Sequence, residues 1–194
     1  MKHPSSRQVF EYWNERRGDR LAPERGDIDP GPMRRVLGDT FILGRDAQGS
    51  YRFRLSGTRT CALFCRELKG ADFLDLWSSS DRCVVKELIT AAAEDCAGFV
   101  AGVIGQNTDN AKVEIEVLLL PLYHRDPAQT RLLGVLAPLV PPYWLGSTAI
   151  EAMTCGTVRH LGADTGDIEG PRLVPGTDNG RLRRGLVVYD GGRS

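Results

Sequence analysis

The sequence has no long apolar run and no excess of charge of either sign. No stretch approaches the eighteen or so apolar residues that span a bilayer, and the start, MKHPSSRQ, lacks a signal-peptide core. The 25 basic and 25 acidic side chains cancel, so no overall field attracts nucleic acid or an anionic membrane. We therefore expect a soluble, cytoplasmic protein that binds neither nucleic acid nor membrane.

Cysteine and histidine are scarce. The five cysteines include no Cys-x-x-Cys pair, and the three histidines show no ligand spacing around them, which argues against a disulfide framework and against a metal site. Cys61 and Cys65 lie four apart on an expected helix. They are interpreted either as packed, buried thiols or as a redox-reactive pair, with packing the preferred interpretation.

Motifs for catalysis are also missing. The sequence contains no Gly-x-Ser-x-Gly, no His-Glu-x-x-His and no phosphate-binding glycine loop. At 194 residues the chain has room for one domain with extensions. The prediction is therefore that the protein is not an enzyme and has no catalytic residues.

What the sequence does contain is a series of short strands and helices. Alternating or continuous apolar residues predict strands at residues 40–45, 51–55, 99–106, 112–120 and 131–139. Helical spacing predicts a helix at residues 5–17 that begins with a capping box at Ser5 and Gln8, a short helix from Pro30 to Leu37, another capped by Thr58, and a longer one at residues 80–97. Two strands, a helical insert and three further strands follow one another.

Residues 53–58 and 66–77 carry a resemblance to a known family. The segments FRLSGT and RELKGADFLDLW resemble the stand-alone alphaproteobacterial PAS proteins, a family of the domain-of-unknown-function type. The resemblance covers about residues 9–146. It implies an α+β PAS fold: a five-stranded antiparallel sheet in the order 2-1-5-4-3, short helices on one face and an N-terminal flanking helix. The expected organisation is a flanking helix at residues 1–18, a PAS domain at 19–146 and a largely flexible extension at 147–194, in which residues 149–160 could form a weak helix or a strand.

By the same resemblance, a ligand pocket would lie between the helices and the concave face of the sheet. Its polar candidates are Arg54, Thr58 and Arg59, which could hold a carboxylate or phosphate. Its other candidates are Phe53, Leu55, Cys61, Cys65, Trp77, Ile115, Val117, Leu133 and Val135. The mostly apolar lining is equally compatible with a core filled by its own side chains.

Two cofactors known from PAS proteins are weighed against the sequence. Residues 65–70, CRELKG, resemble the motif of flavin-binding blue-light receptors, but Phe64 and Lys69 replace its asparagine and glutamine. Ile115 and Leu136 stand where further flavin-binding amides are expected, and unpaired polar atoms of the flavin would cost about 1 to 3 kcal/mol each. The helix that carries the haem histidine in other PAS domains has none here. No cofactor is therefore expected, and Cys65, at a position usually occupied by glycine in the family, is interpreted as a small buried hydrophobe.

The N-terminal helix places Val9, Phe10 and Trp13 on one stripe. Two interpretations carry equal weight: the stripe packs on the domain's own sheet, or it forms the interface of a homodimer, as helices that flank PAS cores often do by resemblance.

The function that the resemblance implies is that of a signalling or regulatory protein without an output domain of its own, which acts on an unidentified partner protein or on a second copy. One alternative is a sensor or carrier that binds a small metabolite in an apolar pocket. A further alternative is a thiol-dependent enzyme or redox sensor at Cys65.

Overall fold

The computed structural model describes residues 1–124, 130–161, 172–173, 182–183 and 186–187. The helices and strands follow the order α1 (Pro4–Arg17), η1 (Arg25–Asp27), η2 (Leu37–Asp39), β1 (Thr40–Arg45), β2 (Tyr51–Ser56), α2 (Thr58–Leu63), η3 (Phe73–Leu76), α3 (Arg82–Glu94), β3 (Gly98–Gln106), β4 (Lys112–Leu122), β5 (Arg131–Pro138), β6 (Ala152–Leu161), β7 (Arg172–Leu173), β8 (Leu182–Arg183) and β9 (Leu186–Val187). The five predicted strands are confirmed to within a few residues.

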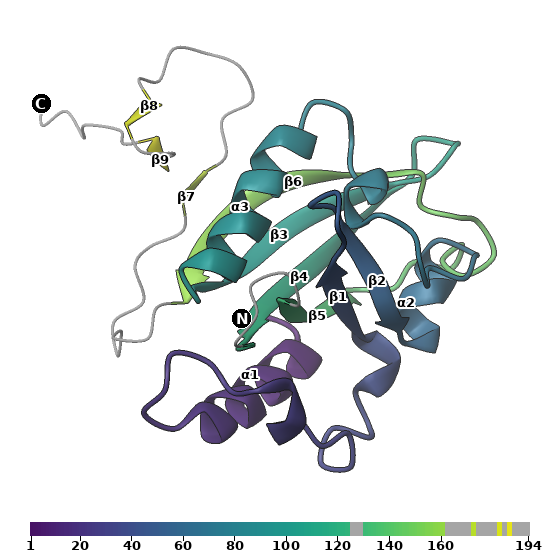
Figure 1. Ribbon diagram of the computed structural model, residues 1–194. Helices are drawn as coiled ribbons and strands as arrows, with labels where there is room; N and C mark the ends of the chain where they lie inside the picture. Colours follow the sequence, from purple (N-terminus) through teal and green to yellow (C-terminus); the bar gives the residue numbers. More distant parts are fainter. Residues whose placement is uncertain (125–129, 162–171, 174–181, 184–185, 188–194) are drawn as a thin grey trace, which may run out of the picture.

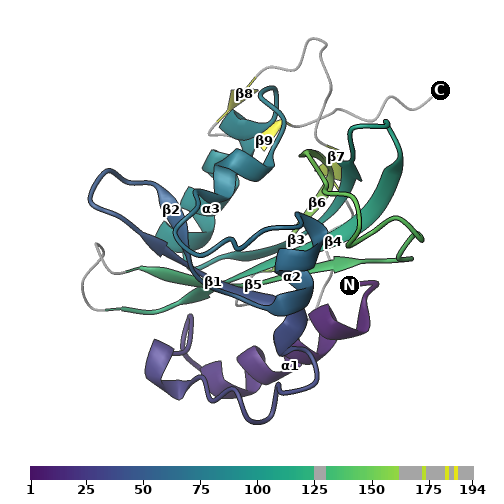
Figure 2. The ribbon, with the colours of Figure 1, turned by 90° about the vertical axis from the view of Figure 1, so that its right-hand side faces the viewer.

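The main sheet has the strand order β2-β1-β5-β4-β3-β6-β7, and all its pairings are antiparallel. Its first five strands reproduce the predicted order 2-1-5-4-3. Figures 1 and 2 show α2 and α3 on one face of this sheet and α1 on the other. The predicted α+β PAS fold with an N-terminal flanking helix is therefore confirmed.

The β1–β2 hairpin follows from its turn residues. Asp46 Oδ1 accepts hydrogen bonds from the backbone N–H groups of Gln48 and Ser50, and Gly49 adopts a φ of 83°, which glycine tolerates at little cost. A β-bulge interrupts the pairing between Ile42 and Leu43, so that Ile42 lies opposite Leu55 whereas Leu43 lies opposite Phe53.

Two apolar cores fill the spaces on either side of the sheet. The inner core lies between the sheet and α2, η3 and α3, and it contains the packed rings of Phe41, Phe53, Phe73 and Trp77, whose neighbouring centroids are 5.3 to 5.8 Å apart. The outer core lies between the sheet and the N-terminal segment and includes Val9, Trp13, Leu118, Leu120, Leu133 and Val135. Burying apolar side chains on both faces gives β4 and β5 their almost uninterrupted apolar sequences.

The N-terminal helix begins one step earlier than predicted. His3 is its N-cap, because His3 Nδ1 accepts a hydrogen bond from the backbone N–H of Ser5. The predicted capping box at Ser5 is therefore wrong; the Ser5 hydroxyl instead donates to Asp39. Thr58 likewise does not cap α2, whose N-cap is Gly57, and residues 30–36 form turns rather than a helix.

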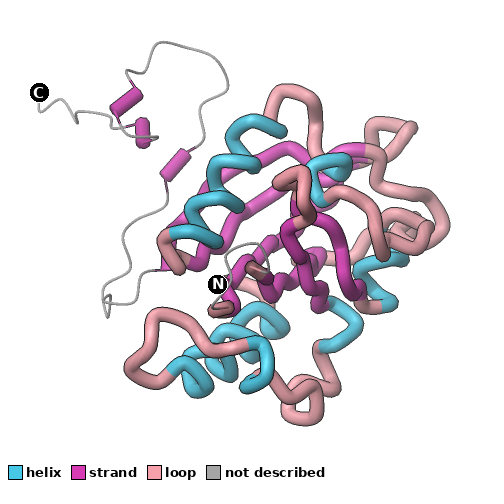
Figure 3. The backbone as a smooth tube through the Cα atoms, viewed as in Figure 1, coloured by secondary structure: helices cyan, strands magenta, loops and turns pink. Residues whose placement is uncertain are grey.

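The segment after the PAS domain adds to the sheet. Within the extension, residues 149–160 were expected to form a weak helix or a strand, and the structure has a strand there: β6, which pairs with β3 along almost its whole length. A strand at the open edge of β3 satisfies backbone groups that would otherwise be unpaired, and Figure 3 shows it as a continuation of the sheet. Most of the extension beyond residue 161, including part of the apolar run 186–189, lies outside the described residues.

Candidate functional site

The inner core is where the sequence predicted a ligand pocket. Phe53, Trp77, Ile115 and Val117 do line it and are at most 3% exposed, and Cys61 packs against it. Their neighbours are other apolar side chains, including Phe41, Phe73 and Ile89. The predicted pocket residues on this face therefore belong to a core packed with the protein's own side chains.

Two predicted floor residues lie on the opposite face of the sheet. Leu133 and Val135 belong to the outer core, whereas Leu132 and Leu136 face the inner core. The prediction was wrong by one residue because β5 is apolar on both faces, so its sequence contains no alternation that fixes which side chains point inward.

Leu55 and Cys65 are not pocket residues either. Leu55 is 49% exposed, because the bulge opposite it ends the regular alternation of β2 after Phe53. Cys65 is exposed and has a φ of 48°, so the expectation of a buried thiol is wrong. A φ in the left-handed region favours glycine, which gives a physical reason for the glycine that the resemblance places at this position.

The three polar candidates separate in the structure. Arg54 is exposed and donates to the backbone carbonyl of Arg45 at 3.5 Å, and Thr58 is exposed on the first turn of α2. Arg59 instead points toward Asp39, with Nε 2.6 Å from Oδ1 and Nη2 2.9 Å from Oδ2. Of the three, Arg59 alone belongs to the site described next.

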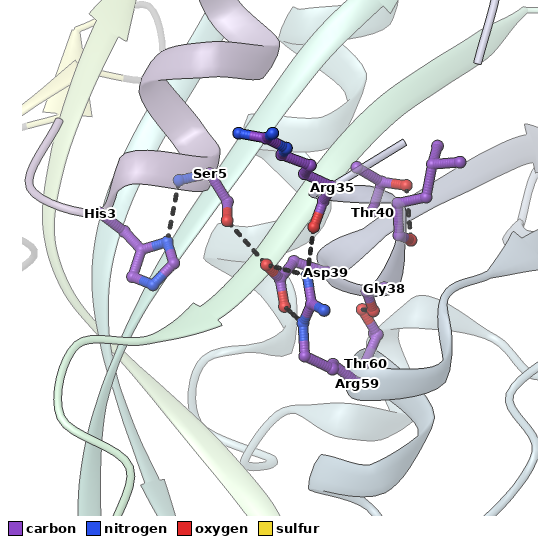
Figure 4. Close-up of polar contacts among 9 residues, drawn as sticks. His3, Ser5, Arg35, Gly38, Asp39, Thr40, Arg59 and Thr60 are labelled. Carbon is purple, nitrogen blue, oxygen red and sulfur yellow. Dashed lines mark hydrogen bonds and ion pairs between the residues drawn. The ribbon is translucent and has the colours of Figure 1, made fainter. Parts of the chain in front are cut away.

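Four residues form what we call the Asp39 network: His3, Ser5, Asp39 and Arg59 (Figure 4). Asp39 is only 5% exposed, and Ser5 Oγ donates to its Oδ2 at 2.7 Å. Arg59 Nη2 also donates to the carbonyl of Arg35 at 3.1 Å. The network joins the first turn of α1, the end of η2 and the first turn of α2, so three separate elements depend on one carboxylate.

The electrostatics of Asp39 follow from these contacts. Burial by itself raises the pKa of Asp39, but hydrogen bonds from Arg59 and Ser5 and the charge of Arg59 outweigh it, so this pKa lies below its ordinary value. The same hydrogen bond raises the pKa of Arg59. Asp39 is therefore ionised at neutral pH and held by two donors.

Glycine makes the close approach of Arg59 possible. A Cβ atom at Gly38 would lie 2.8 Å from the guanidinium carbon of Arg59, closer than real Cβ contacts allow. The guanidinium therefore lies close to the backbone of Gly38, in space that a side chain at this position would occupy.

His3, Ser5 and Asp39 are residue types found in hydrolase triads, but their arrangement differs from one. The hydroxyl of Ser5 donates to the carboxylate of Asp39, and His3 contacts the backbone N–H of Ser5 rather than its hydroxyl. A triad requires the histidine to act as the base for the hydroxyl. In this geometry the network holds elements together instead of activating a nucleophile.

A pocket of about 310 Å³, which we call the Asp39 pocket, opens beside the network. Its polar lining residues are His3, Asp39 and Arg59, and the others are apolar: Ala62, Leu63, Pro138, Pro141, Leu145 and Gly146. A second hollow of about 460 Å³ lies on the outer face of β3, β4 and β6 beside the N-terminus. There Glu116 accepts hydrogen bonds from the backbone N–H groups of Lys2, at 2.5 Å, and His3, at 3.0 Å, which ties the start of the chain to the sheet.

Sequence reasoning missed three of the four network residues. Ser5 and Asp39 are 34 positions apart, and neither occurs in a motif that links it to Arg59. Their proximity results from the packing of α1 on the outer face, which no local pattern reveals.

The sequence model of the family described as PAS domain matches residues 1–137, more than half of the chain. This protein belongs to the PAS domain family. The match confirms the family named by the resemblance, while the alphaproteobacterial subclass stays a prediction. A comparison with curated protein sequences gives no match.

Several solved structures are similar to this PAS protein at low sequence identity. The PAS domain of a protein from Colwellia psychrerythraea is 18% identical, with a TM-score of 0.40, over 57% of this chain and 97% of that one. The PAS domain of an HTR-like protein from Haloarcula marismortui is 17% identical, with a TM-score of 0.39, over 53% and 86%. An RNA-binding light-oxygen-voltage receptor is 15% identical, with a TM-score of 0.42, over 60% of this chain and 35% of that one.

Two further observations bear on the sequence predictions. Among the described residues, no helix is long and apolar enough to cross a membrane. In the same part of the chain, no group of three or more His, Cys, Asp or Glu side chains is placed to hold a metal ion.

Proposed function

We propose that this PAS protein transmits a signal from its PAS core to another protein through the position of α1. The proposal rests on one observation: Ser5 in α1 and Arg59 in α2 both donate hydrogen bonds to the buried carboxylate of Asp39. Helices on opposite faces of the sheet are thereby connected (Figure 2).

The coupling follows from the energetics of a buried charge. A carboxylate that loses a partner in a buried site leaves an uncompensated charge, which typically costs about 3 to 5 kcal/mol. The side chain of Arg59 is more than half exposed, so water can partly replace its interaction with the carboxylate. The cost of losing Arg59 is therefore smaller than this range. A displacement of α2 that removes Arg59 therefore favours a rearrangement of η2 and of the α1 turn that holds Ser5.

The output in this proposal is a change at the surface of α1. Val9 and Trp13 are at most 4% exposed and pack in the outer core, so as α1 lies here they have no free surface for a second subunit. Phe10 is half-buried, and the outer side of α1 is polar. A partner protein or a second copy would contact that side, and the cytoplasm stays the predicted location.

Hydrogen exchange tests the coupling. In Asp39→Asn we expect faster exchange in residues 5–12 and also in residues 58–63, because both helices lose the charged partner. Glu15→Gln, on the exposed side of α1, is the matched control and should change neither segment. Faster exchange confined to residues 37–40 in Asp39→Asn would contradict the proposal.

Partner recovery tests the output. The wild-type protein and Asp39→Asn, each used as bait in the cells of origin, should recover one shared partner to different extents. Light scattering on the same samples distinguishes a second copy from a different protein, because a single chain has a mass of 21.3 kDa. Identical recovery with both baits would argue against α1 as the output.

A small-molecule sensor is the second candidate function. It is favoured by the Asp39 pocket, which places an apolar hollow beside the charged groups of the network. A heat-stability screen with a metabolite library tests it, since a ligand that binds only the folded state raises the unfolding temperature. Neither of these two candidate functions involves catalysis. The alternative of a thiol-dependent activity at Cys65 predicts that Cys65→Gly loses function.

A further inference from the structure

The Asp39 pocket combines an apolar floor with two hydrogen-bond donors on its rim. The floor includes Ala62, Leu63 and Leu145, and the donors belong to His3 and Arg59. In the view of Figure 4 the carboxylate of Asp39 lies between these two side chains, of which His3 is the N-cap of α1 and Arg59 belongs to the first turn of α2. Small-molecule sites typically have this composition, in which apolar walls provide affinity and a few polar groups fix orientation.

Arg59 retains donor capacity that the network does not use. Its Nε and Nη2 atoms are bonded to Asp39 and to the carbonyl of Arg35. In the part of the chain that the structure describes, no acceptor is bonded to its Nη1 atom, which carries two N–H groups. More than half of the Arg59 side chain is exposed, so the guanidinium group is partly open to solvent.

His3 supplies the second donor because of its role as N-cap. Its Nδ1 atom accepts the backbone N–H of Ser5 at 3.1 Å, so the proton of the neutral ring lies on Nε2. Within residues 1–124 and 130–161, no acceptor is bonded to Nε2. The same helix cap that starts α1 therefore presents a donor at the rim of the pocket.

We propose that the Asp39 pocket binds an amphipathic monocarboxylate, with the carboxylate on Arg59 and His3 and the aliphatic body on Ala62, Leu63 and Leu145. An ionised carboxylate accepts hydrogen bonds and donates none, so it matches a pocket whose unused polar groups are N–H donors. Asp39 does not supply a competing acceptor, because both its oxygens are occupied and it is only 5% exposed.

A single carboxylate also fits the charge of the site better than a phosphate. The charges of Arg59 and Asp39 cancel, so no surplus positive charge remains to hold a dianion. Binding then depends on directional donors and apolar contact. The ligand class proposed for the Asp39 pocket rests on the proposed function for its biological meaning. Binding of the ligand is measured separately from signalling.

Two probes of matched shape test the proposal. Hexanoate and hexanamide share their chain, and they differ in that only hexanoate carries the charge. In two-dimensional NMR titrations of the full-length protein, we expect hexanoate to shift the amides of residues 59–63 and 145–146. Hexanamide should bind at least tenfold more weakly.

Substitution of Ala62 provides the matched variants. Ala62 is exposed on α2 and lines the pocket, so either replacement is tolerated by the fold. Ala62→Glu and Ala62→Gln have nearly the same size, but only the former adds a negative charge to the pocket. Both replacements fill part of the apolar lining and should weaken hexanoate binding, and we expect Ala62→Glu to weaken it at least threefold more than Ala62→Gln.

His3→Asn tests the second donor. Asparagine is a good N-cap, so α1 is retained while the donor at the Nε2 position is lost, and we expect hexanoate to bind several-fold more weakly. The proposal is overturned by any of three results: no shifts with hexanoate, equal binding of hexanamide, or shifts confined to the inner-core residues Phe73 and Trp77. None of these results would alter the hydrogen-exchange result for Asp39→Asn, so the two proposals fail independently.

Discussion

The ring of Phe41 lies directly over the backbone of Gly134 on the neighbouring strand. The two residues are paired in register between β1 and β5, and a Cβ atom at Gly134 would lie 2.1 Å from Cζ of Phe41. Phe41 is fully buried and contacts the rings of Phe53 and Phe73. The absence of a side chain at Gly134 therefore creates the space in which the aromatic part of the inner core is packed.

Gly134→Ala is expected to destabilise the protein. The methyl group forces Phe41 out of its position, and such overpacking typically costs about 1 to 3 kcal/mol. Urea unfolding measures the change. Gly102→Ala on β3 is the matched control, because its Cβ would meet only Thr157 Oγ1, at 3.1 Å; equal losses in the two variants would show that the clash with Phe41 is not the cause.

Asp39 should contribute to the acid sensitivity of the fold. Because the pKa of Asp39 is lowered in the folded state, its stabilisation is present above the unfolded value of about 3.9 and is lost as the pH falls through the folded value. The free energy of unfolding of the wild type should therefore fall more steeply below about pH 4 than that of Asp39→Asn. Parallel curves for the two proteins, measured by urea unfolding across this range, would contradict the assignment.

Cys65 occupies a backbone conformation that suits glycine. Its φ of 48° costs a residue with a Cβ about 1 to 2 kcal/mol, whereas glycine has no such penalty. We expect Cys65→Gly to be more stable than Cys65→Ala, by about 1 kcal/mol after the greater chain entropy of glycine is included. Thermal unfolding of both variants measures the difference, and a less stable glycine variant would show that the conformation is not strained.

The five thiols should differ in their reaction with an alkylating reagent. Cys65 and Cys83 are exposed, whereas burial, and then the charge of Asp81, raise the pKa of Cys155 to about 12. The thiolate is the reactive form, so at about pH 8 iodoacetamide should modify Cys65 and Cys83 while Cys155 stays unmodified. Peptide mass spectrometry of the folded and the urea-unfolded protein checks this order, and early labelling of Cys155 would count against it.

Trp13 should act as a structural residue of the outer core. Its ring is 4% exposed, and Nε1 donates to the carbonyl of Pro121 at 2.8 Å. Trp13→Ala is expected to cost about 3 to 5 kcal/mol, measured by urea unfolding. Phe10→Ala, on the same helix but half-exposed, should cost far less. A larger loss of stability in Phe10→Ala than in Trp13→Ala would show that Trp13 is not the main contact of α1 with the outer core.

The same packing predicts how a truncated protein behaves. Removal of residues 1–18 uncovers Leu118, Leu120 and Leu133 on the outer face, which favours aggregation rather than a soluble protein. Light scattering distinguishes these outcomes. A soluble and folded protein of unchanged stability would show that the sheet does not need α1.

Local patterns predicted most of the secondary structure. The alternation Tyr51, Arg52, Phe53 predicted β2, and Asp46 to Gly49 predicted the turn before it, because each depends on residues that are close in sequence. For β6 the sequence left helix and strand open, since its residues Ala152 to Leu161 have a weak apolar pattern and acquire strand structure by pairing with β3.

The sequence by itself determined the five strands of the PAS core, because strands depend on periodicity and turn residues along the chain. The fold class, the order of these strands and the family came from the resemblance of residues 53–58 and 66–77 to known PAS proteins. Only the tertiary structure decided that Leu133 faces the outer core, that Val9 and Trp13 pack against their own sheet, and that Ser5 and Arg59 meet at Asp39. Such contacts join residues from different elements. They follow from how helices pack on the two faces of the sheet, and the local sequence around each residue is the same whichever face is covered.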